Sequence, residues 1–450
     1  MTRPGQQRAP VGLSFVIRTI DLRSRSLTPA QLAAVMPRPE LDVEAAEAAA
    51  AALVSAVRER GAAALAEQAE RFDGGAPASI RVPQAELAEA AETLEPALRA
   101  ALEEAIRRVR EASRAQVPPE RTTSLGPGAS VRQRWQPVRR VGLYVPGGKA
   151  VYPSSVVMNV VPAQVAGVES IALASPPQRE HGGRVHPTIL AAAHLLGVTE
   201  VYAMGGAGAI GALAHGVPEI GLDPVDVITG PGNVYVAAAK RIVKGRVGID
   251  AEAGPTEILV IADGTADPVL VAADLVSQAE HDELAAAVLV TDSEELADGV
   301  RAELEARVPA TRHAARVRVS LGGPQSAIVL VDDLATAARV SDEYGPEHLE
   351  IQVADPVTTL AAIRNAGAIF VGPSSPVSLG DYLAGSNHVL PTGGQSRFSS
   401  GLSAMAFLRP QQVIEYDLPA LDLVRRRIVA LAGAEDLPAH GEAVTARFEH

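Results

Sequence analysis

The stretch LVSQAEHDE, residues 275 to 283, places two polar side chains three positions apart. On a helix, Gln278 and His281 would therefore share one face. An imidazole nitrogen is a common zinc ligand, and an amide oxygen is an unusual but chemically sensible one. The pair is a candidate for part of a metal site, although spacing alone does not establish one.

A carboxylate and an imidazole are adjacent in YGPEHLE, residues 344–350. Glu347 and His348 follow a Gly-Pro turn and precede a stretch that reads as a strand, so both could point into a cleft. Together they would supply two proton acceptors that work near neutral pH. A salt-bridged surface turn explains the same residues equally well at this point.

Other candidate metal ligands lie further along the chain. Asp381 and His388 fall in the glycine-broken stretch SLGDYLAGSNHVLPTGG, and His440 falls in DLPAHGEAV. Taken alone, each has a simpler explanation, because an aspartate often caps a turn and a histidine on a polar tail is usually solvated.

Two glycine-rich stretches follow predicted strands. GGAGAIG, residues 205–211, contains the GxGxxG spacing of a dinucleotide-binding turn, but the acid about 20 residues on, Asp226, begins a strand rather than ending one. In GPGNVYVAAAKR, a strand leads into a helix, so Asn233 either faces a ligand or simply caps that helix. By contrast, PGGKA at 146–150 does not have the spacing of a Walker phosphate loop.

Composition limits the elements that could hold these residues. The chain has 450 residues, is 47% hydrophobic and only 3% aromatic, which favours an α/β fold with a core of small aliphatic residues. Its net charge of −13 argues against a nucleic-acid partner. We find no signal-peptide pattern and no apolar run of about 20 residues, so we expect a soluble, cytoplasmic protein without a membrane partner.

The absence of cysteine excludes disulfides, thiolate zinc sites and a cysteine nucleophile. Any aldehyde oxidation in this protein would therefore proceed through a hydrate rather than a thiohemiacetal.

Hydrophobic patterning predicts helices and two sets of alternating strands. Residues 41–72 and 84–116 read as Ala-rich helices, and 118–140 as a charged, turn-forming boundary. The predicted strands lie at 141–145, 170–174, 200–204, 226–230, 257–263, 287–292, 326–331, 349–353 and 368–372, with helices at 268–285, 293–306 and 418–432. Two α/β lobes are the simplest interpretation.

Seven segments together resemble the histidinol dehydrogenase family, from about residue 40 to about 445. They are YVPGGKAVYPSSVVMNVVPAQVAGV, GPGNVYVAAAKR, AGPTEILVIAD, DLVSQAEHD, YGPEHLE, GDYLAGSNHVLPTGG and RFSSGLS, in this order. The resemblance implies two Rossmann-like, three-layer α/β lobes in a domain-swapped homodimer. We expect 1–136 to be a helical part of the first lobe, 137–253 the NAD-contacting second lobe, 254–395 the rest of the first lobe, and 396–450 a tail exchanged between subunits.

The resemblance also implies roles for particular residues. One zinc ion per subunit would be held by Gln278, His281, Asp381 and His440, with His440 supplied by the partner subunit. Glu347 and His348 would be catalytic. The substrate would contact the four zinc ligands and His348 as well as Thr256, His388 and Glu435, and NAD would contact Tyr144, Gly208 and Asn233.

The implied reaction is the oxidation of L-histidinol by two NAD⁺ to L-histidine through the aldehyde, which completes histidine biosynthesis. His348 would take the hydroxyl proton, Glu347 would activate water, and zinc would orient the substrate. Two positions depart from the family: Gly208 stands where glutamine is usual, and Thr256 where serine is common.

Three alternatives stay open from the sequence. The chain could be a related zinc- and NAD-dependent dehydrogenase of another small alcohol. It could be a zinc hydrolase with Glu347 as general base, although it lacks the HExxH motif. A non-catalytic small-molecule binder is a third, which the combination of Glu347, His348 and four ligand types disfavours. The ligand set would accept manganese as well as zinc.

Overall fold

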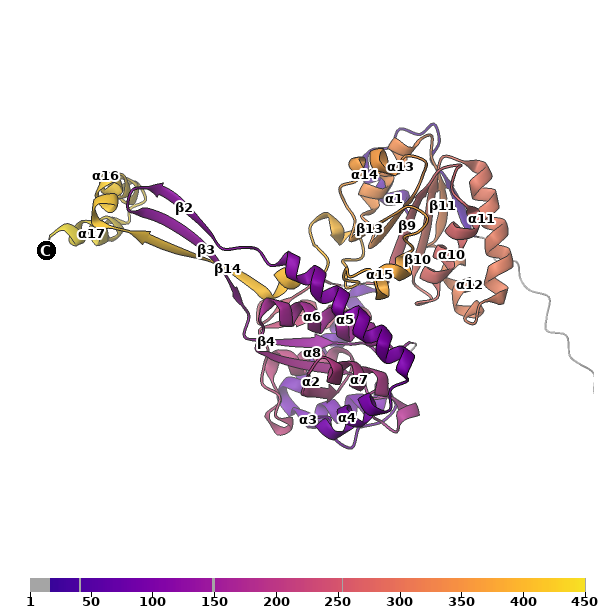
Figure 1. Ribbon diagram of the computed structural model, residues 1–450, viewed down its shortest axis with the longest axis horizontal. Helices are drawn as coiled ribbons and strands as arrows, with labels where there is room; N and C mark the ends of the chain where they lie inside the picture. Colours follow the sequence, from indigo (N-terminus) through magenta and orange to yellow (C-terminus); the bar gives the residue numbers. More distant parts are fainter. Residues whose placement is uncertain (1–16, 40–41, 148–149, 253, 450) are drawn as a thin grey trace, which may run out of the picture.

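The computed structural model describes residues 17–39, 42–147, 150–252 and 254–449. Two parallel β-sheets, each covered by helices on both faces, form two lobes, and a separate antiparallel sheet extends from one of them as an arm (Figure 1). The predicted α/β class with two lobes is confirmed.

The first sheet has six parallel strands. Their order is β1 (Arg18–Asp21), β11 (Ala327–Leu330), β10 (Ala286–Thr291), β9 (Glu257–Ala262), β12 (His348–Gln352) and β13 (Ala368–Val371). The central strands read as continuous runs such as EILVIA and AAVLVT because both of their faces are buried.

Helices cover this first sheet on both sides. α10 (Pro268–Ala279), α11 (Glu294–Arg307) and α12 (Ala314–Gly322) share one hydrophobic cluster with one face of the sheet. α1 (Pro29–Val35) and α13 (Leu334–Tyr344) pack against the other face. Two shorter helices complete the lobe, α14 (Pro356–Ala362) and α15 (Val377–Tyr382).

The second sheet has five parallel strands. Their order is β6 (Glu200–Ala203), β5 (Ser170–Ser175), β4 (Arg140–Tyr144), β7 (Val227–Thr229) and β8 (Gly248–Ile249). α4 (Gln84–Glu92), α5 (Pro96–Gln116), α6 (Pro153–Ala166) and α7 (Pro187–Leu195) cover one face. α2 (Val43–Arg60), α3 (Ala62–Gln68), α8 (Gly206–His215) and α9 (Val234–Val243) cover the other.

The position of the N-terminal helices corrects the expected division of the chain. We expected residues 1–136 to belong with the first lobe, but α2 to α5 pack on the second sheet, and only β1 and α1 of the described N-terminal part join the first. The apolar periodicity of an Ala-rich helix shows which face is buried, but it does not show which sheet buries it.

The arm is built from two segments that are far apart in the sequence. β2 (Arg121–Gly126) and β3 (Ala129–Pro137) pair with β14 (Leu408–Tyr416), and α16 (Leu418–Ala434) and α17 (Pro438–Thr445) lie at its far end (Figure 1). The composition of 118–140 predicts a boundary instead of these strands, because exposed strands such as RTTSLG have no buried face to produce an alternating pattern.

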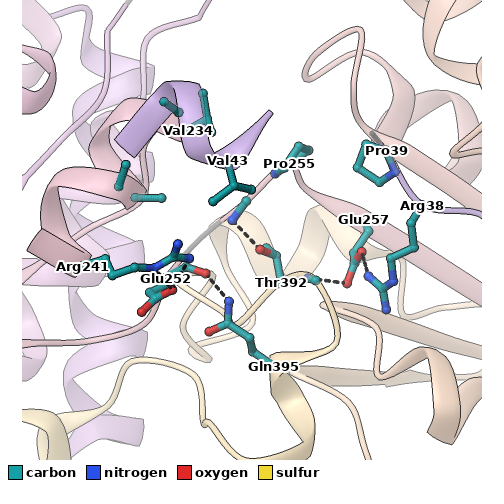
Figure 2. Close-up of a pocket in the computed structure, with 15 residues that line it drawn as sticks. Arg38, Pro39, Val43, Val234, Arg241, Glu252, Pro255, Glu257, Thr392 and Gln395 are labelled. Carbon is teal, nitrogen blue, oxygen red and sulfur yellow. Dashed lines mark hydrogen bonds and ion pairs between the residues drawn. The ribbon is translucent and has the colours of Figure 1, made fainter. Parts of the chain in front are cut away.

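Where the two lobes meet, the amino ends of the strands of the first sheet face the carboxyl ends of the strands of the second sheet. β9 and β12 begin at the interlobe side with Glu257 and His348, whereas β4 and β7 end there with Tyr144 and Thr229. A cavity of 170 Å³ lies between the lobes, lined by α9 of the second lobe and by residues around Glu257 and Thr392 of the first (Figure 2). Among the described residues, no helix is long and apolar enough to cross a membrane.

Candidate active site

Glu347 and His348 stand at the entrance to β12. α13 ends at Gly345, whose φ of 56° is a left-handed conformation that glycine adopts without strain. The turn carries the chain through Pro346 into the strand, so that Glu347 and His348 are both buried at its amino end. The predicted arrangement of turn, Glu-His pair and strand is therefore confirmed, and the pair is not an exposed surface turn.

Two donors hold the carboxylate of Glu347. The Thr256 hydroxyl donates to Glu347 Oε2 over 2.6 Å, and the Glu257 backbone N–H donates to the same atom over 2.9 Å. Burial nevertheless raises the pKa of Glu347 to about 8, because few polar groups replace the lost water. A carboxylate with such a pKa is a competent base near neutral pH.

The ring of His348 is fixed by the main chain. Its Nδ1 atom lies 3.0 Å from the carbonyl oxygen of Glu257, which can only accept, so Nδ1 carries the proton and Nε2 is the acceptor. Burial lowers the pKa of His348, so the neutral form is favoured. The side chain of Glu347 lies 3.6 Å from Nδ1, beyond a normal hydrogen bond.

Glu257 positions both residues, and sequence reasoning missed it. Its own carboxylate is buried and accepts from Arg38 Nη1 at 2.6 Å and from Gly393 N at 3.1 Å (Figure 2). The hydroxyl of Tyr344 also donates to it over 3.3 Å. Burial raises its pKa to about 7 although Arg38 opposes this. The sequence feature that indicates Glu257 is its position as a charged residue at the start of the apolar run EILVIA.

Gln278 is joined to the same network. It is buried near the end of α10, and its Nε2 donates to the Thr256 hydroxyl over 2.7 Å. Thr256 thus accepts one hydrogen bond from Gln278 and donates one to Glu347. The amide oxygen of Gln278 has no hydrogen bond to the described residues, which leaves it free for another ligand.

His281 differs slightly from its predicted setting. We expected a helix to residue 285, but α10 ends at Ala279 and His281 lies in the turn that follows. Burial lowers the pKa of His281, and the charge of Asp381 partly offsets this, so a carboxylate of α15 faces this imidazole. A neutral imidazole and a nearby carboxylate are the forms that zinc binds.

Gln278, His281 and Asp381 are of the types that bind zinc, but three ligands leave its coordination shell incomplete. The described part of one chain contains no cluster of three His, Cys, Asp or Glu side chains able to hold a metal. His440 is exposed on α17, at the far end of the arm from α10 and α15 (Figure 1). Glu435, at the end of α16, is exposed on the same arm.

His388 connects the two lobes. Its Nδ1 lies 2.9 Å from the carbonyl oxygen of Asp381, and its Nε2 lies 3.0 Å from the hydroxyl of Ser155 on α6. Burial lowers the pKa of His388, and the charge of Asp381 opposes this. His388 is therefore placed at the edge of the same cluster, beside one of the predicted zinc ligands.

Two of the predicted NAD contacts stand at the carboxyl edge of the second sheet. Tyr144 ends β4, and its hydroxyl accepts a hydrogen bond from Gly206 N at 3.1 Å. Asn233 caps α9, accepting from Tyr235 N and Val236 N at 3.1 Å each. The capping role considered from sequence is confirmed for Asn233, and its NH₂ group forms no hydrogen bond with the part of the chain that the structure describes.

Gly208 is buried in α8, and a neighbour fills the space beside it. A Cβ atom at this position would overlap Oε1 of Gln68 on α3, whose Nε2 donates to the carbonyl oxygen of Leu53 over 3.1 Å. The departure from glutamine at this position therefore leaves room for a different glutamine side chain, contributed by the N-terminal helices.

The acid suggested by the GxGxxG spacing lies elsewhere. Asp226 precedes β7 at the amino edge of the second sheet, where its carboxylate accepts from Arg139 N and Arg140 N at 3.1 Å each. It thus lies at the opposite edge of the sheet from Gly206 and Tyr144, which are at the carboxyl edge. The lysine of PGGKA lies outside the described residues.

Comparisons with known proteins agree with one another. A family model described as histidinol dehydrogenase matches residues 36–448. A histidinol dehydrogenase from Leifsonia xyli subsp. xyli is 70% identical over 433 residues, which cover 96% of this chain and 99% of the relative. One from Mycolicibacterium smegmatis is 58% identical, covering 97% and 98% of the two chains. The crystal structure of histidinol dehydrogenase from Elizabethkingia anophelis superposes with a TM-score of 0.89 at 31% identity, covering 96% and 98%.

Proposed function

The chain belongs to the histidinol dehydrogenase family, the enzymes of the final steps of histidine biosynthesis, and we propose that it oxidises L-histidinol to L-histidine with two NAD⁺ in the interlobe cleft. The observation that carries the proposal is the network of Gln278, Thr256, Glu347 and His348. It joins a free amide oxygen, a buried base and an imidazole with an accepting Nε2.

The protein's own residues divide the proton transfers between them. His348 Nε2 takes the proton of the substrate hydroxyl, because Nδ1 is already committed to Glu257 O. Glu347 then deprotonates the water that adds to the aldehyde, and His348 acts again when the hydrate is oxidised. Thr256 keeps Glu347 aimed throughout by donating to Oε2.

Gln278, His281 and Asp381, with His440 of the partner subunit, would hold zinc, and Tyr144, the α8 segment around Gly208, and Asn233 would contact NAD. When bound, zinc would orient the imidazole and amino group of histidinol, and NAD would accept the hydride. His388, Thr256 and the partner's Glu435 complete the substrate contacts.

The exposed arm supports the proposal of a dimer. His440 and Glu435 lie far from the cleft of their own chain, on an arm whose helix α16 exposes Leu418, Leu423 and Leu431. Exchange of residues 396–450 between two subunits would cover these side chains and bring both polar residues to the opposite cleft.

A subunit-mixing experiment tests the shared site. His348→Asn and His440→Ala homodimers should each be inactive. Mixed after dissociation and reassembly, they should regain about a quarter of the wild-type sites, because about half of the dimers are mixed and each mixed dimer has one intact site. No recovery in verified mixed dimers would mean that His440 acts within its own chain, whereas an active His440→Ala homodimer would mean that His440 is not needed.

Product analysis tests the reaction itself. Zinc-loaded protein should convert L-histidinol to L-histidine only when NAD is supplied. A turnover independent of NAD would instead favour the zinc hydrolase, in which Glu347 activates metal-bound water.

A further inference from the structure

A carboxylate from the N-terminal helices lies against the start of α8. α3 leads into a π-helical turn, Ala69–Asp73, that ends in the left-handed Gly74. A Cβ atom added to Gly205 would stand 2.7 Å from Asp73 Oδ2 and 2.8 Å from Oδ1, and also 2.7 Å from Pro176. Gly205 therefore has to be glycine so that Asp73 can reach the carboxyl edge of the second sheet.

This carboxylate has no partner among the described residues. It forms no hydrogen bond or ion pair with them, although the side chain is only partly exposed. Burial raises the pKa of Asp73 to about 6, and no cation opposes this effect. An acceptor that is partly withdrawn from water without a donor costs stability, which fits a group that receives its donors from a ligand.

The position of Asp73 indicates the class of ligand that would supply these donors. The charge of Asp73 contributes to the raised pKa of Tyr144, so its carboxylate lies near the tyrosine whose hydroxyl accepts from Gly206 N. In open α/β sheets, dinucleotides bind at the carboxyl edge, and an acidic residue there accepts the ribose hydroxyls. Asp226, the acid at the expected sequence distance, is excluded because it lies at the amino edge.

We propose that Asp73 accepts hydrogen bonds from the ribose hydroxyls of NAD and disfavours NADP. A carboxylate matches two adjacent hydroxyl donors, whereas a 2′-phosphate would replace one donor with negative charge. This inference rests on the proposed binding of NAD at this edge, but it adds a residue that is about 130 positions before the glycine-rich turn and that no spacing rule selects.

Asp73→Asn and Asp73→Ala test the inference by calorimetric titration of each protein with NAD and with NADP, in which the Kd for NAD should rise at least about tenfold. The same variants are then assayed in steady-state oxidation of L-histidinol with both cofactors. We expect the KM for NAD to rise at least about tenfold, since a hydrogen bond to a charged group is lost, with kcat and the KM for histidinol within about twofold. The NAD-to-NADP preference in kcat/KM should fall by at least a similar factor. Asp226→Asn, the same change at the opposite edge, should leave both quantities unchanged.

Each result has a distinct meaning. Wild-type turnover of histidinol that does not need NAD would remove the proposed function on which the inference rests. With an active wild type, an unchanged KM for NAD in both Asp73 variants would overturn the inference alone. Equal losses with NAD and NADP would also overturn it, because a merely structural role predicts no change in preference.

Discussion

The Nδ1 atom of His348 lies 3.0 Å from the backbone carbonyl oxygen of Glu257. This contact fixes the tautomer, because a carbonyl oxygen accepts and cannot donate. The same residue donates its N–H to Glu347. One peptide segment at the start of β9 therefore aims the carboxylate of Glu347 and sets the proton position of the His348 imidazole.

His348→Asn should lower turnover by about 10²- to 10⁴-fold, the usual contribution of a general base. Zinc content should not change, since His348 is not among the proposed ligands. The measurement is kcat together with metal analysis of the purified variant. His194→Asn, on the exposed face of α7, is the matched control and should retain full activity. A His348 variant with near wild-type turnover would show that another group is the base.

Glu347→Gln should impair oxidation of the aldehyde more than oxidation of the alcohol, because only the second step needs activated water. In the wild type, the rate of aldehyde oxidation should rise as pH increases through about 8, since burial raises the pKa of Glu347 and its basic form appears above that value. The variant should lack this rise. Half-reactions started from L-histidinal at several pH values measure it, and equal losses in both steps would contradict the role.

Gly208→Ala should change the free energy of unfolding in opposite directions in two backgrounds. In the wild type, the new methyl group displaces the Gln68 side chain from the Leu53 carbonyl oxygen. The lost hydrogen bond should lower the free energy of unfolding by about 1 kcal/mol. In a Gln68→Ala background the space is free, and alanine in place of a helical glycine should stabilise by up to about 1 kcal/mol. Urea unfolding of the four proteins in a double-mutant cycle measures the coupling. Additive effects would mean that Gln68 does not occupy this space.

Glu350→Gln should change how stability depends on pH. Glu350 is buried beside Asp274, and burial together with that charge raises its pKa to about 9. The folded state therefore binds this proton more tightly than the unfolded chain, and its contribution to stability falls as pH rises from about 5 to about 9. Between pH 6 and pH 9, the free energy of unfolding of the variant should therefore rise by about 1 kcal/mol or more relative to that of the wild type.

Urea unfolding at the two pH values checks this expectation, with the exposed Glu305→Gln as control. Parallel pH profiles for Glu350→Gln and the wild type would show that Glu350 does not titrate in this window.

Much of the fold could be predicted from the sequence because its signals are local. The buried strands around Leu259 and Val288 form apolar runs, and the break at Gly61 between α2 and α3 was visible in the Ala-rich pattern. The arm could not be predicted in the same way. Its strands are exposed, and β3 pairs with β14 from about 280 residues further along the chain.

The site was predictable in part for the same reason. The Glu347–His348 pair and the Gln278–His281 spacing are local patterns. Glu257 and Arg38 act through contacts across the fold, and no spacing connects them to the Glu347–His348 pair. Asp73 reaches Gly205 in the same way, from another part of the sequence. The proposed fourth zinc ligand, His440, would come from another subunit, which one chain's sequence order cannot reveal.

The most direct test of the proposed function is the number of NADH molecules formed per molecule of L-histidinol consumed by zinc-loaded protein. Two NADH, with L-histidine as the product, is the predicted result, because Glu347 and His348 together support both oxidations. One NADH with accumulated aldehyde would contradict the role given to Glu347, and no NADH at all would contradict the dehydrogenase reaction.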